Sequence, residues 1–595
     1  MMSQSLSLYC FIFSLLSLSV NSQELIDISD GYTVPKKTDT DYYWVPIFGT
    51  NDIHGKIFPA QYAHPEGTGT YKSGGAEYIY AYKKIIESEW GKDRFLWLDG
   101  GDQFQGGLEF MLSNGTIMNK FYNKAGVNAM AIGNHDFDFG VEELQKDMAG
   151  SNFIYLSANI KNTTSGKYIY EEWEKVKATE MFTLGDVKIG VIGLATVLTP
   201  IMSGTVPSEL SFEPYRDIII ELSKKLRDDG ANAVLLLPHF GPLCPDTSNK
   251  KLDIGLRDKD TEQLVCDDKQ EYNILLNSLP EQYIDAVIAA HVHDVSHHWI
   301  GNIPVVESSG AFYSHVIYLP FKKDDTGKYT VVKDKIKIEG PLPSCEKVFT
   351  NTKRCDYVPI GETSQGALTN YKFHGQVIEL DPEMKTLLDD WRAIIDAKLK
   401  NIIVDNEEKL VTDNTQETAL TNLLTDAGRR ITGADIGLFN LGGFRTEWYP
   451  GQLNEIDLFL MFPFNNTFVS VEMSGREVIR MLKTIQTGTS VNPSSGLIQL
   501  FKNDGNGNIR ILDAKLFDGY LVKKIELDKT YTICLNDFLA DGGSFFSKVK
   551  KWYVEKNRID YGTIRELMEK YLKSLGKIAK GSLIDPKHPR IRYLK

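Results

Sequence analysis

Five short apolar runs in the sequence each lead directly into residue types that bind metal ions. The runs and the residues that follow them are Val45–Thr50 with Asp52 and His54, Phe95–Asp99 with Asp102, Ala129–Ile132 with Asn134 and His135, Ala233–Leu237 with His239, and Asp285–Ala290 with His291 and His293. Parallel strands bring their carboxyl ends to one edge of a sheet, where ligands bind. One histidine after a strand is more often a satisfied core residue than a ligand. Five such strand ends favour a shared metal site.

These side chains could hold two cations for phosphoryl transfer. Two divalent ions about 3.5–4 Å apart clamp the attacking and leaving oxygens of the reaction, and they need one carboxylate that bridges them. Asp102 is the candidate bridge. The other candidate ligands are Asp52, His54 and His293 for one ion, and Asn134, His239 and His291 for the other. A mixed Asp, Asn and His set suits zinc, manganese, cobalt or iron better than calcium or magnesium, so we expect two divalent ions, zinc or manganese first.

His135 and Asp138 are the candidate catalytic pair. His135 follows the candidate ligand Asn134 directly and so points elsewhere, and Asp138 comes three residues later. A histidine held by a carboxylate can act as a general acid or stabilise developing charge; the carboxylate raises its pKa and nearby metal ions lower it. Asp138 could also cap a helix that starts near Val141, and both roles could hold together.

The remaining histidines give no sign of ligating a metal. His297 and His298 lie in a polar stretch and are predicted to be solvated. His64 is interpreted as an ordinary loop residue, and His315, within the apolar run 312–319, as a residue of strand packing.

Length and charge restrict the kind of protein. A chain of 595 residues is too long for one hydrophobic core, so two large domains are expected. The net charge is −13 and basic residues form no cluster, which argues against binding a nucleic-acid polymer. Phosphate esters remain compatible with an acidic chain when metal ions supply the local positive charge.

The first 22 residues are predicted to be a secretory signal peptide. Residues 6–20 are apolar, and Val20-Asn21-Ser22 has the small-residue pattern of a cleavage site. The basic segment that usually precedes the apolar run is missing, so an uncleaved signal anchor stays open. No other run is long enough to span a bilayer, and residues 589–595 do not resemble a lipid-anchor signal. We expect a protein that is secreted or in the lumen of the secretory pathway, or periplasmic in a bacterium.

The cysteines agree with an oxidising compartment. Cys244 with Cys266, and Cys345 with Cys355, form two sequence-local pairs in polar segments, as small disulfide loops do, although free thiols remain an alternative. Cys534 lies in an apolar strand and is predicted to be a buried thiol. Glycosylation sequons occur at Asn114, Asn162 and Asn465.

The pattern along the chain divides it into two domains and a connecting helix. From about 43 to 321, short apolar runs alternate with amphipathic segments at 76–90, 141–148 and 217–229, which is typical of β-α-β units on a sheet. Residues 322–371 are polar and are predicted to be a hairpin plus linker. Asp381-Pro382 opens a clear helix. We therefore expect a phosphoesterase domain over 40–380, a linker helix over 381–400 and a second domain over 401–580.

The second domain is expected to mix helices and strands around two glycine-rich loops. A helix is predicted at 419–431, and strands at 436–441, 467–472 and 533–537. The loops are Asn440-Leu441-Gly442-Gly443-Phe444-Arg445 and Leu539-Ala540-Asp541-Gly542-Gly543-Ser544.

Together these motifs resemble the secreted and periplasmic 5′-nucleotidases, which are two-domain dimetal phosphoesterases. The matching stretches are 50–55, Gly101-Asp102, 133–138, His239 and 290–293 in the first half, and 440–445, 462–464 and 536–543 in the second. The resemblance implies an α/β chain, α+β overall. A four-layer α/β/β/α calcineurin-like metallophosphoesterase domain would be joined by a helix to an α/β substrate-binding domain.

The resemblance also implies an activity and a substrate pocket. Metal-activated water would hydrolyse a nucleoside 5′-monophosphate to nucleoside and phosphate, with His135 assisting and Asp138 orienting it. The base would lie between Phe464 and Phe538, and the C-terminal domain would rotate to carry the substrate to the metals. The remaining substrate-binding candidates are Asn440, Gly442, Gly443 and Arg445. Two aromatic faces suit a planar base and Arg suits phosphate or ribose, although both Phe could also be core residues.

Three positions depart from the family pattern. Gln416 stands where an Arg that meets the phosphate is usual, Leu441 replaces a Gly, and Ser544 stands where an Asp often contacts the ribose. Losing the Arg and the Asp contacts should cost roughly 1.5–3 kcal/mol each. Alternative activities are therefore a 2′,3′-cyclic nucleotide phosphodiesterase, an apyrase, a UDP-sugar hydrolase or another phosphoesterase. A non-catalytic nucleotide-binding protein and a homodimer formed through the C-terminal domain also remain open.

Overall fold

A computed structural model gives the fold of the chain. It describes residues 25–594 except 64–69, 105–107, 114, 204, 245–252, 262–265, 267–270, 281, 356–364, 489, 505–507 and 553–556. The predicted signal peptide, His64 and the sequon at Asn114 lie outside the described residues. Within the described part, no helix has the length and apolar character needed to cross a membrane.

Two β-sheets packed face to face form the centre of the N-terminal domain. One has the strand order β10-β11-β13-β15-β17-β16, and the other β14-β20-β18-β2-β5-β6-β7-β9 with β19 paired to β18. The first comprises β10 (Thr179–Leu184), β11 (Val187–Ala195), β13 (Ala233–His239), β15 (Ala286–Ile288), β16 (Ser296–Ile300) and β17 (Ile303–Glu307). The second comprises β2 (Tyr43–Thr50), β5 (Leu96–Asp99), β6 (Ala129–Ala131), β7 (Ile154–Leu156), β9 (Val176–Lys177), β14 (Gly255–Arg257), β18 (Tyr313–Lys323), β19 (Tyr329–Val331) and β20 (Lys337–Pro343). Aliphatic side chains from both sheets, such as Ile47 and Leu235, share one buried core between them.

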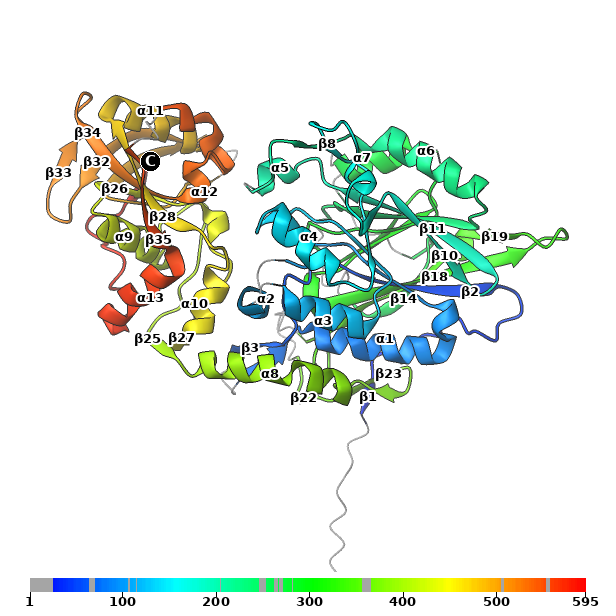
Figure 1. The fold of residues 1–595 in the computed structure, drawn as a ribbon. Helices are drawn as coiled ribbons and strands as arrows, with labels where there is room; N and C mark the ends of the chain where they lie inside the picture. The colour runs from blue at the N-terminus through cyan, green and yellow to red at the C-terminus, as the bar shows by residue number, and fades with distance from the viewer. Residues whose placement is uncertain are drawn as a thin grey trace, which may run out of the picture.

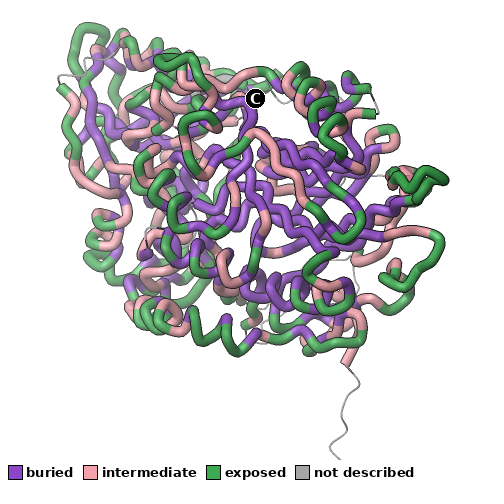
Figure 2. Tube along the Cα trace, turned by 45° about the vertical axis from the view of Figure 1, so that its right-hand side comes forward, coloured by how far each residue is buried: buried purple, intermediate pink, exposed green. Residues whose placement is uncertain are grey.

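Helices cover the outer faces of both sheets, so the domain has the four layers α/β/β/α that the family resemblance implies. On the nine-stranded sheet lie α1 (Ala76–Trp90) and α3 (Thr116–Ala125), and on the six-stranded sheet α6 (Tyr215–Asp228) and α7 (Glu271–Ser278) (Figure 1). Figure 2 shows that buried residues concentrate on the central strands and that exposed residues lie on the outer surfaces of the helices. The fold prediction is confirmed.

All five apolar runs singled out in the sequence form strands of these sheets. Three of the strands, β2, β5 and β6, are parallel neighbours in the nine-stranded sheet, and β13 and β15 are parallel neighbours in the other. Each run is buried on both faces, which is why it is continuously apolar rather than alternating. Their carboxyl ends therefore reach one edge of the double sheet.

The prediction of a hairpin plus linker over 322–371 is right in its first part and wrong in its second. Strand β19 forms a hairpin with the end of β18, with Lys322 opposite Thr330, but the part expected to be a linker contains a core strand. Residues 337–343 form β20, a buried strand that pairs with both β18 and β14. Its polar residue Glu339 is fully buried because its carboxylate accepts hydrogen bonds from Tyr318 Oη at 2.7 Å and binds His374 Nε2 at 2.9 Å. Glu339 made this segment look polar in the sequence, because its buried partners are distant along the chain. The segment was therefore predicted to be a linker rather than an internal strand.

His374 gives a stability prediction for this region. Burial alone would lower its pKa, but Glu339 and Glu89 raise it to about 10. A histidine whose folded-state pKa exceeds its unfolded value of about 6.5 stabilises the fold fully below that pH. The stabilisation is lost as the pH rises through about 10. We expect His374→Gln to lower the free energy of unfolding by about 3 kcal/mol at pH 6 and by much less at pH 10, measured by denaturant unfolding.

The control is His588→Gln, because His588 is half-buried at the surface, where it stacks on Phe517 and pairs with the exposed Asp585; the change should have a small effect that is the same at both pH values. An equal deficit for His374→Gln at pH 6 and pH 10 would contradict the buried ion pair.

The C-terminal domain packs helices against three small sheets. Its helices are α9 (Ala419–Thr432), α10 (Glu455–Met461), α11 (Gly475–Ile485), α12 (Asp537–Ala540) and α13 (Ile564–Leu575). The central sheet has the order β30-β26-β34-β28-β35 and comprises β26 (Ile436–Leu438), β28 (Thr467–Ser474), β30 (Ser494–Ser495), β34 (Thr530–Asn536) and β35 (Ile559–Thr563). The other two comprise β25 (Ile402–Asn406), β27 (Gly451–Asn454) and β36 (Lys577–Ile578), and β29 (Thr487–Gly488), β31 (Leu497–Asn503), β32 (Ile509–Phe517), β33 (Val522–Lys524) and β37 (Ile591–Tyr593). The strand expected at 436–441 ends at Leu438 because the chain turns there toward a 3-10 helix, Leu441–Gly443.

Helix α8 (Pro382–Leu399) joins the two domains along one side of the molecule (Figure 1). It starts where the sequence predicts, with the Asp381 carboxylate accepting the backbone N–H of Met384 at 2.8 Å. Helix α10 of the C-terminal domain packs here, with Phe459 and Ile395 of α8 buried in a small apolar cluster. An ion pair between Lys398 and Glu455 adds to this contact.

Both predicted cysteine pairs are disulfides. Cys244 is bonded to Cys266 and Cys345 to Cys355, while Cys534 is a buried free thiol.

Candidate metal centre and substrate pocket

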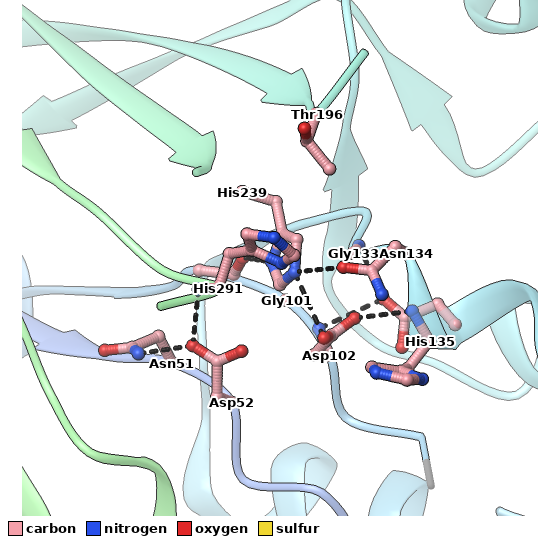
Figure 3. A network of polar contacts seen from close by, with 12 residues as sticks. Asn51, Asp52, Gly101, Asp102, Gly133, Asn134, His135, Thr196, His239 and His291 are labelled. Carbon is pink, nitrogen blue, oxygen red and sulfur yellow. Dashed lines mark hydrogen bonds and ion pairs between the residues drawn. The ribbon is translucent and has the colours of Figure 1, made fainter. Parts of the chain in front are cut away.

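The strand ends converge on one polar cluster of the N-terminal domain (Figure 3). Two groups of side chains each have potential ligand atoms within 4.8 Å of one another. The first group is Asp52, His54, Asp102 and His293, and the second is Asp102, His239 and His291. The seventh candidate, Asn134, has its Oδ1 3.2 Å from His239 Nε2. Asp102 belongs to both groups, as a bridging ligand must.

Asp52 and Asp102 each use one carboxylate oxygen to accept a backbone hydrogen bond, which leaves the second oxygen available to a cation. Asp102 Oδ1 accepts the backbone N–H of His135 at 2.8 Å, and Asp52 Oδ2 accepts that of His291 at 2.8 Å. The remaining oxygens, Asp52 Oδ1 and Asp102 Oδ2, are buried without a hydrogen-bond partner, as is Nδ1 of His291. Buried polar atoms without partners are costly, so their gathering at one point fits a bound cation.

Hydrogen bonds to backbone carbonyls orient two of the imidazole rings so that each can bind a cation through Nε2. His54 Nδ1 lies 2.9 Å from the carbonyl oxygen of Phe104, and His239 Nδ1 lies 2.8 Å from that of Gly100. A carbonyl oxygen only accepts hydrogen bonds, so each Nδ1 carries the proton and each Nε2 presents a lone pair. His54 Nε2 lies 2.9 Å from His293 Nε2, and His293 Nε2 lies 3.1 Å from Asp52 Oδ1. This donor set fits two divalent cations.

The loops that carry the candidate ligands adopt an unusual backbone conformation. Among the described residues, eight non-glycine residues have positive φ, and five of them are candidate ligands. They are Asp52 (52°), His54 (49°), Asp102 (56°), His291 (81°) and His293 (60°). Such conformations cost about 1–3 kcal/mol each and persist where the surroundings impose them, which is common at functional sites. Here backbone hydrogen bonds join the loop after β2 to the loop after β5. Asp52 N donates to Gly101 O at 2.9 Å, and His54 N donates to Asp102 O at 3.0 Å.

Two residues that support the Asp102 loop were missed in the sequence. Asp136 is fully buried, and its carboxylate accepts backbone N–H groups of Asp102, Gln103, Phe104 and Gly133 at 2.8–3.2 Å. Gly133 is needed because an added Cβ would lie 2.0 Å from Asp102 Oδ1. The sequence shows that Gly133 and Asp136 belong to the motif Gly-Asn-His-Asp, but only the structure shows that both support the Asp102 loop.

Glu307, also missed, supports the loop that carries His291 and His293. It is fully buried at the end of β17, and its Oε1 accepts the backbone N–H groups of Val292 at 2.8 Å and His293 at 2.9 Å. The strand Ile303–Glu307 is one more apolar run that ends in a polar residue. The rule that singled out the other five runs would therefore have found it.

Glu307 gives a prediction for metal binding. Glu307→Ala removes the acceptor of two backbone N–H groups and should weaken metal affinity about 10- to 100-fold, measured by metal content after dialysis against graded chelator. Glu307→Gln keeps the accepting oxygen and should stay within about threefold of the wild type. Equal metal loss in both variants would show that the charge of Glu307, rather than its hydrogen bonds, supports the site.

The candidate pair His135 and Asp138 stands beside the metal cluster. His135 Nδ1 lies 2.7 Å from Asp138 Oδ2. Burial alone would lower the pKa of His135, but the carboxylates of Asp138 and Asp102 raise it to about 9. The alternative that Asp138 caps the next helix is wrong, because α4 (Val141–Ala149) follows Gly140 and no side chain caps it.

The structure corrects the interpretation of two other histidines. His297 and His298, predicted to be solvated, are 4% exposed on β16. Neither ring nitrogen of His298 has a hydrogen-bond partner, and burial lowers its pKa to about 4, so it is a neutral core residue. His315 is fully buried in β18 as expected, with its Nδ1 3.0 Å from Ser308 Oγ.

The candidate substrate-binding residues gather on neighbouring loops of the C-terminal domain. Asn536 Nδ2 donates to Asn440 Oδ1 at 2.9 Å, and Asn466 Nδ2 donates to Asp537 Oδ1 at 2.7 Å, which ties the loops of Asn440, Phe464 and Phe538 together. Phe464 and Phe538 are both half-buried, and Phe538 packs against the apolar core of the C-terminal domain. Gly442 is exposed, Gly443 is buried against Phe439, and the Arg445 guanidinium lies 5.6 Å from the Phe464 ring centre.

Arg445 connects the two domains electrostatically. It is exposed, yet enough protein surrounds its guanidinium to lower the pKa by desolvation, and the Asp138 carboxylate opposes that shift. The loop that carries Arg445 therefore lies near enough to the candidate catalytic pair for the Asp138 carboxylate to affect the pKa of Arg445. Gln416 donates its amide to Asp413 Oδ2 at 2.8 Å, and Ser544 has φ 53° at the start of a 3-10 helix.

Comparison with known proteins follows the same division into two halves. Residues 45–295 match the calcineurin-like phosphoesterases, and residues 397–551 match the 5′-nucleotidase C-terminal domain. The chain belongs to the 5′-nucleotidase family. A 5′-nucleotidase of Vibrio cholerae is 26% identical over 558 residues, 89% of this chain and 90% of that protein. A 5′-nucleotidase-related protein of Glossina morsitans morsitans is 22% identical over 575 residues, 89% and 93% of the two chains.

A solved structure shares the fold over nearly the whole length. The 5′-nucleotidase precursor from Thermus thermophilus superposes with a TM-score of 0.67 at 21% identity, covering 93% of this chain and 99% of that one. This likeness shows the fold. The two family-model matches and the Vibrio cholerae relative show that the chain is a hydrolase of the metallophosphoesterase type, and the family implies divalent metal ions.

Proposed function

We propose that this 5′-nucleotidase family member hydrolyses nucleoside 5′-monophosphates to nucleoside and inorganic phosphate, using two divalent cations held by Asp102 and its neighbours. The observation that carries the proposal is the pair of ligand groups that share Asp102, with His135 and Asp138 alongside. When bound, the two ions would polarise the phosphoryl group and activate water.

The protein side chains have separate tasks in this reaction. His135, held by Asp138, gives a proton to the oxygen of the leaving nucleoside or stabilises the charge on it. Phe464 and Phe538 would stack on the base, and Arg445 would bind phosphate or ribose. Asn440 fixes the arrangement of the loops through its hydrogen bond with Asn536.

We propose that both ions are zinc or manganese, because the candidate ligands include oxygen atoms of Asp52, Asp102 and Asn134 and nitrogen atoms of four histidines. We also propose that the protein works outside the cytosol. Its two disulfides support an oxidising compartment, and the apolar stretch at residues 6–20 supports secretion.

The test is phosphate release from a panel of esters. The panel contains AMP and other nucleoside monophosphates, ADP, ATP, cyclic nucleotides, a UDP-sugar and p-nitrophenyl phosphate, each with and without chelator and with zinc or manganese restored. Chelator-sensitive release led by nucleoside monophosphates supports the proposal. Release led by another ester reassigns the C-terminal pocket, and no release from any ester contradicts the proposed activity.

A further inference from the structure

The carboxylate of Asp138 is held on both sides. Its Oδ2 lies 2.7 Å from His135 Nδ1, and its Oδ1 accepts a hydrogen bond from Ser203 Oγ at 3.0 Å. Rotation of an Asp carboxylate about χ2 is broad and roughly two-fold, so one hydrogen bond leaves its plane poorly fixed. A second contact on the opposite oxygen fixes the plane and, with it, the direction of the bond to His135.

Ser203 itself is firmly placed. It is 2% exposed and ends helix α5 (Thr199–Met202), where its backbone N–H donates to Thr199 O at 2.9 Å. The hydroxyl of Thr199 in turn donates to Thr196 O at 2.7 Å. Thr196 directly follows β11 and lies above the metal cluster in Figure 3. A short hydrogen-bonded path therefore leads from the edge of the sheet to Asp138.

The protons available at Ser203 settle the direction of its hydrogen bond. Ser203 Oγ lies 2.9 Å from Thr205 Oγ1, and Thr205 Oγ1 also contacts Phe137 O. Two hydroxyl protons thus serve three contacts. A charged carboxylate is a stronger acceptor than a hydroxyl or a carbonyl, so the Ser203 proton goes to Asp138. The Thr205 proton then serves Phe137 O or Ser203 Oγ, and both arrangements strengthen the hold on this turn.

We propose that Ser203 is a positioning residue of the active site, which aligns Asp138 so that His135 faces the leaving group of the phosphoester. The inference rests on the proposed function, because it takes His135 as the group that assists departure of the nucleoside. Among the described residues, the hydrogen-bond partners of the Ser203 hydroxyl are Asp138 and Thr205, so it acts on His135 through Asp138.

A double-mutant cycle tests this role. Ser203→Ala should lower kcat on the best nucleoside monophosphate about 10-fold, leave KM within about twofold and retain both metal ions. In an Asp138→Ala background the same change should cost nothing further, because its only route to His135 is gone. With p-nitrophenyl phosphate, whose leaving group needs little protonation, the loss should shrink to about twofold.

Two further variants keep the result interpretable. Ser223→Ala is the matched control, since Ser223 is a fully buried serine of the same domain whose hydroxyl donates to Tyr283 O at 2.6 Å, and it should leave kcat unchanged. If Ser203→Ala fails to fold, Ser203→Cys fills nearly the same space with a weak donor and should show the same kinetic loss.

Losses that multiply in the Ser203→Ala, Asp138→Ala double variant overturn the proposal, as does an equal loss with every leaving group. Failure of the proposed function is distinct, because it shows in the wild type: another ester then leads the panel, and the cycle is measured on that ester. A wild type that releases phosphate from no ester overturns both.

Discussion

Asp102→Asn should lose at least one of two metal ions per chain and lower turnover by about 10³-fold or more. Asp102 Oδ2 is the one carboxylate oxygen common to both ligand groups, 3.1 Å from His239 Nε2 and 3.8 Å from His54 Nε2. Asparagine keeps the shape and can still accept the N–H of His135, but it removes the negative charge between two cations. Metal ions supply several kcal/mol of transition-state stabilisation, and each 1.36 kcal/mol is a factor of ten in rate.

Elemental analysis after dialysis, together with phosphate release, measures both effects. Asp147→Asn is the control, since Asp147 is a buried carboxylate of α4 whose pKa burial raises to about 7, so the neutral amide should be tolerated. A full complement of two ions in Asp102→Asn would refute the bridging role.

His135→Ala should give the opposite combination: both metal ions retained and turnover reduced by about 10²-fold or more. His135 is in neither ligand group: its Nδ1 is paired with Asp138, its ring packs edge to face on His54 with ring centres 5.4 Å apart, and its backbone N–H donates to Asp102. Removing the ring therefore leaves the candidate ligands in place while taking away the proton donor. Metal content, thermal unfolding and kcat measured on one preparation separate these effects.

His588→Ala is the control for that experiment, because His588 is a half-buried surface histidine of the C-terminal domain that is paired with Asp585 and belongs to neither ligand group. Unchanged turnover in His135→Ala would remove His135 from the mechanism, and loss of metal would mean that the loop rather than the ring had been disturbed.

The sequence was sufficient to predict the strands and the ligand types for a simple reason. Strands buried on both faces, such as β2 and β13, must be continuously apolar, and the polar residue that ends each one stands out. Some helices were also found: the amphipathic segment at 76–90 is α1, and α8, whose start signal is Asp381-Pro382, begins at Pro382 as predicted.

What the sequence could not provide is the set of contacts between loops that are distant along the chain. Ser203 and Asp138 are separated by 65 residues, and nothing local in either segment points to the other. Glu307 and Asp136 each fix a loop through backbone N–H groups, which carry no residue signature. For the same reason β20 was predicted to be part of a linker and His298 to be solvated, since their burial depends on neighbouring strands rather than on their own residues.

The narrow contact around α8 and α10 has a consequence for how this protein can diversify. A few apolar side chains, including Ile395 and Phe459, and the ion pair Lys398–Glu455 connect two domains that each have their own core. All three departures from the family pattern, at Gln416, Leu441 and Ser544, lie in the C-terminal domain. Under the proposed function, substitutions there would change which leaving group is recognised and leave the candidate metal ligands unaltered, so selection could change the preferred substrate while conserving the reaction.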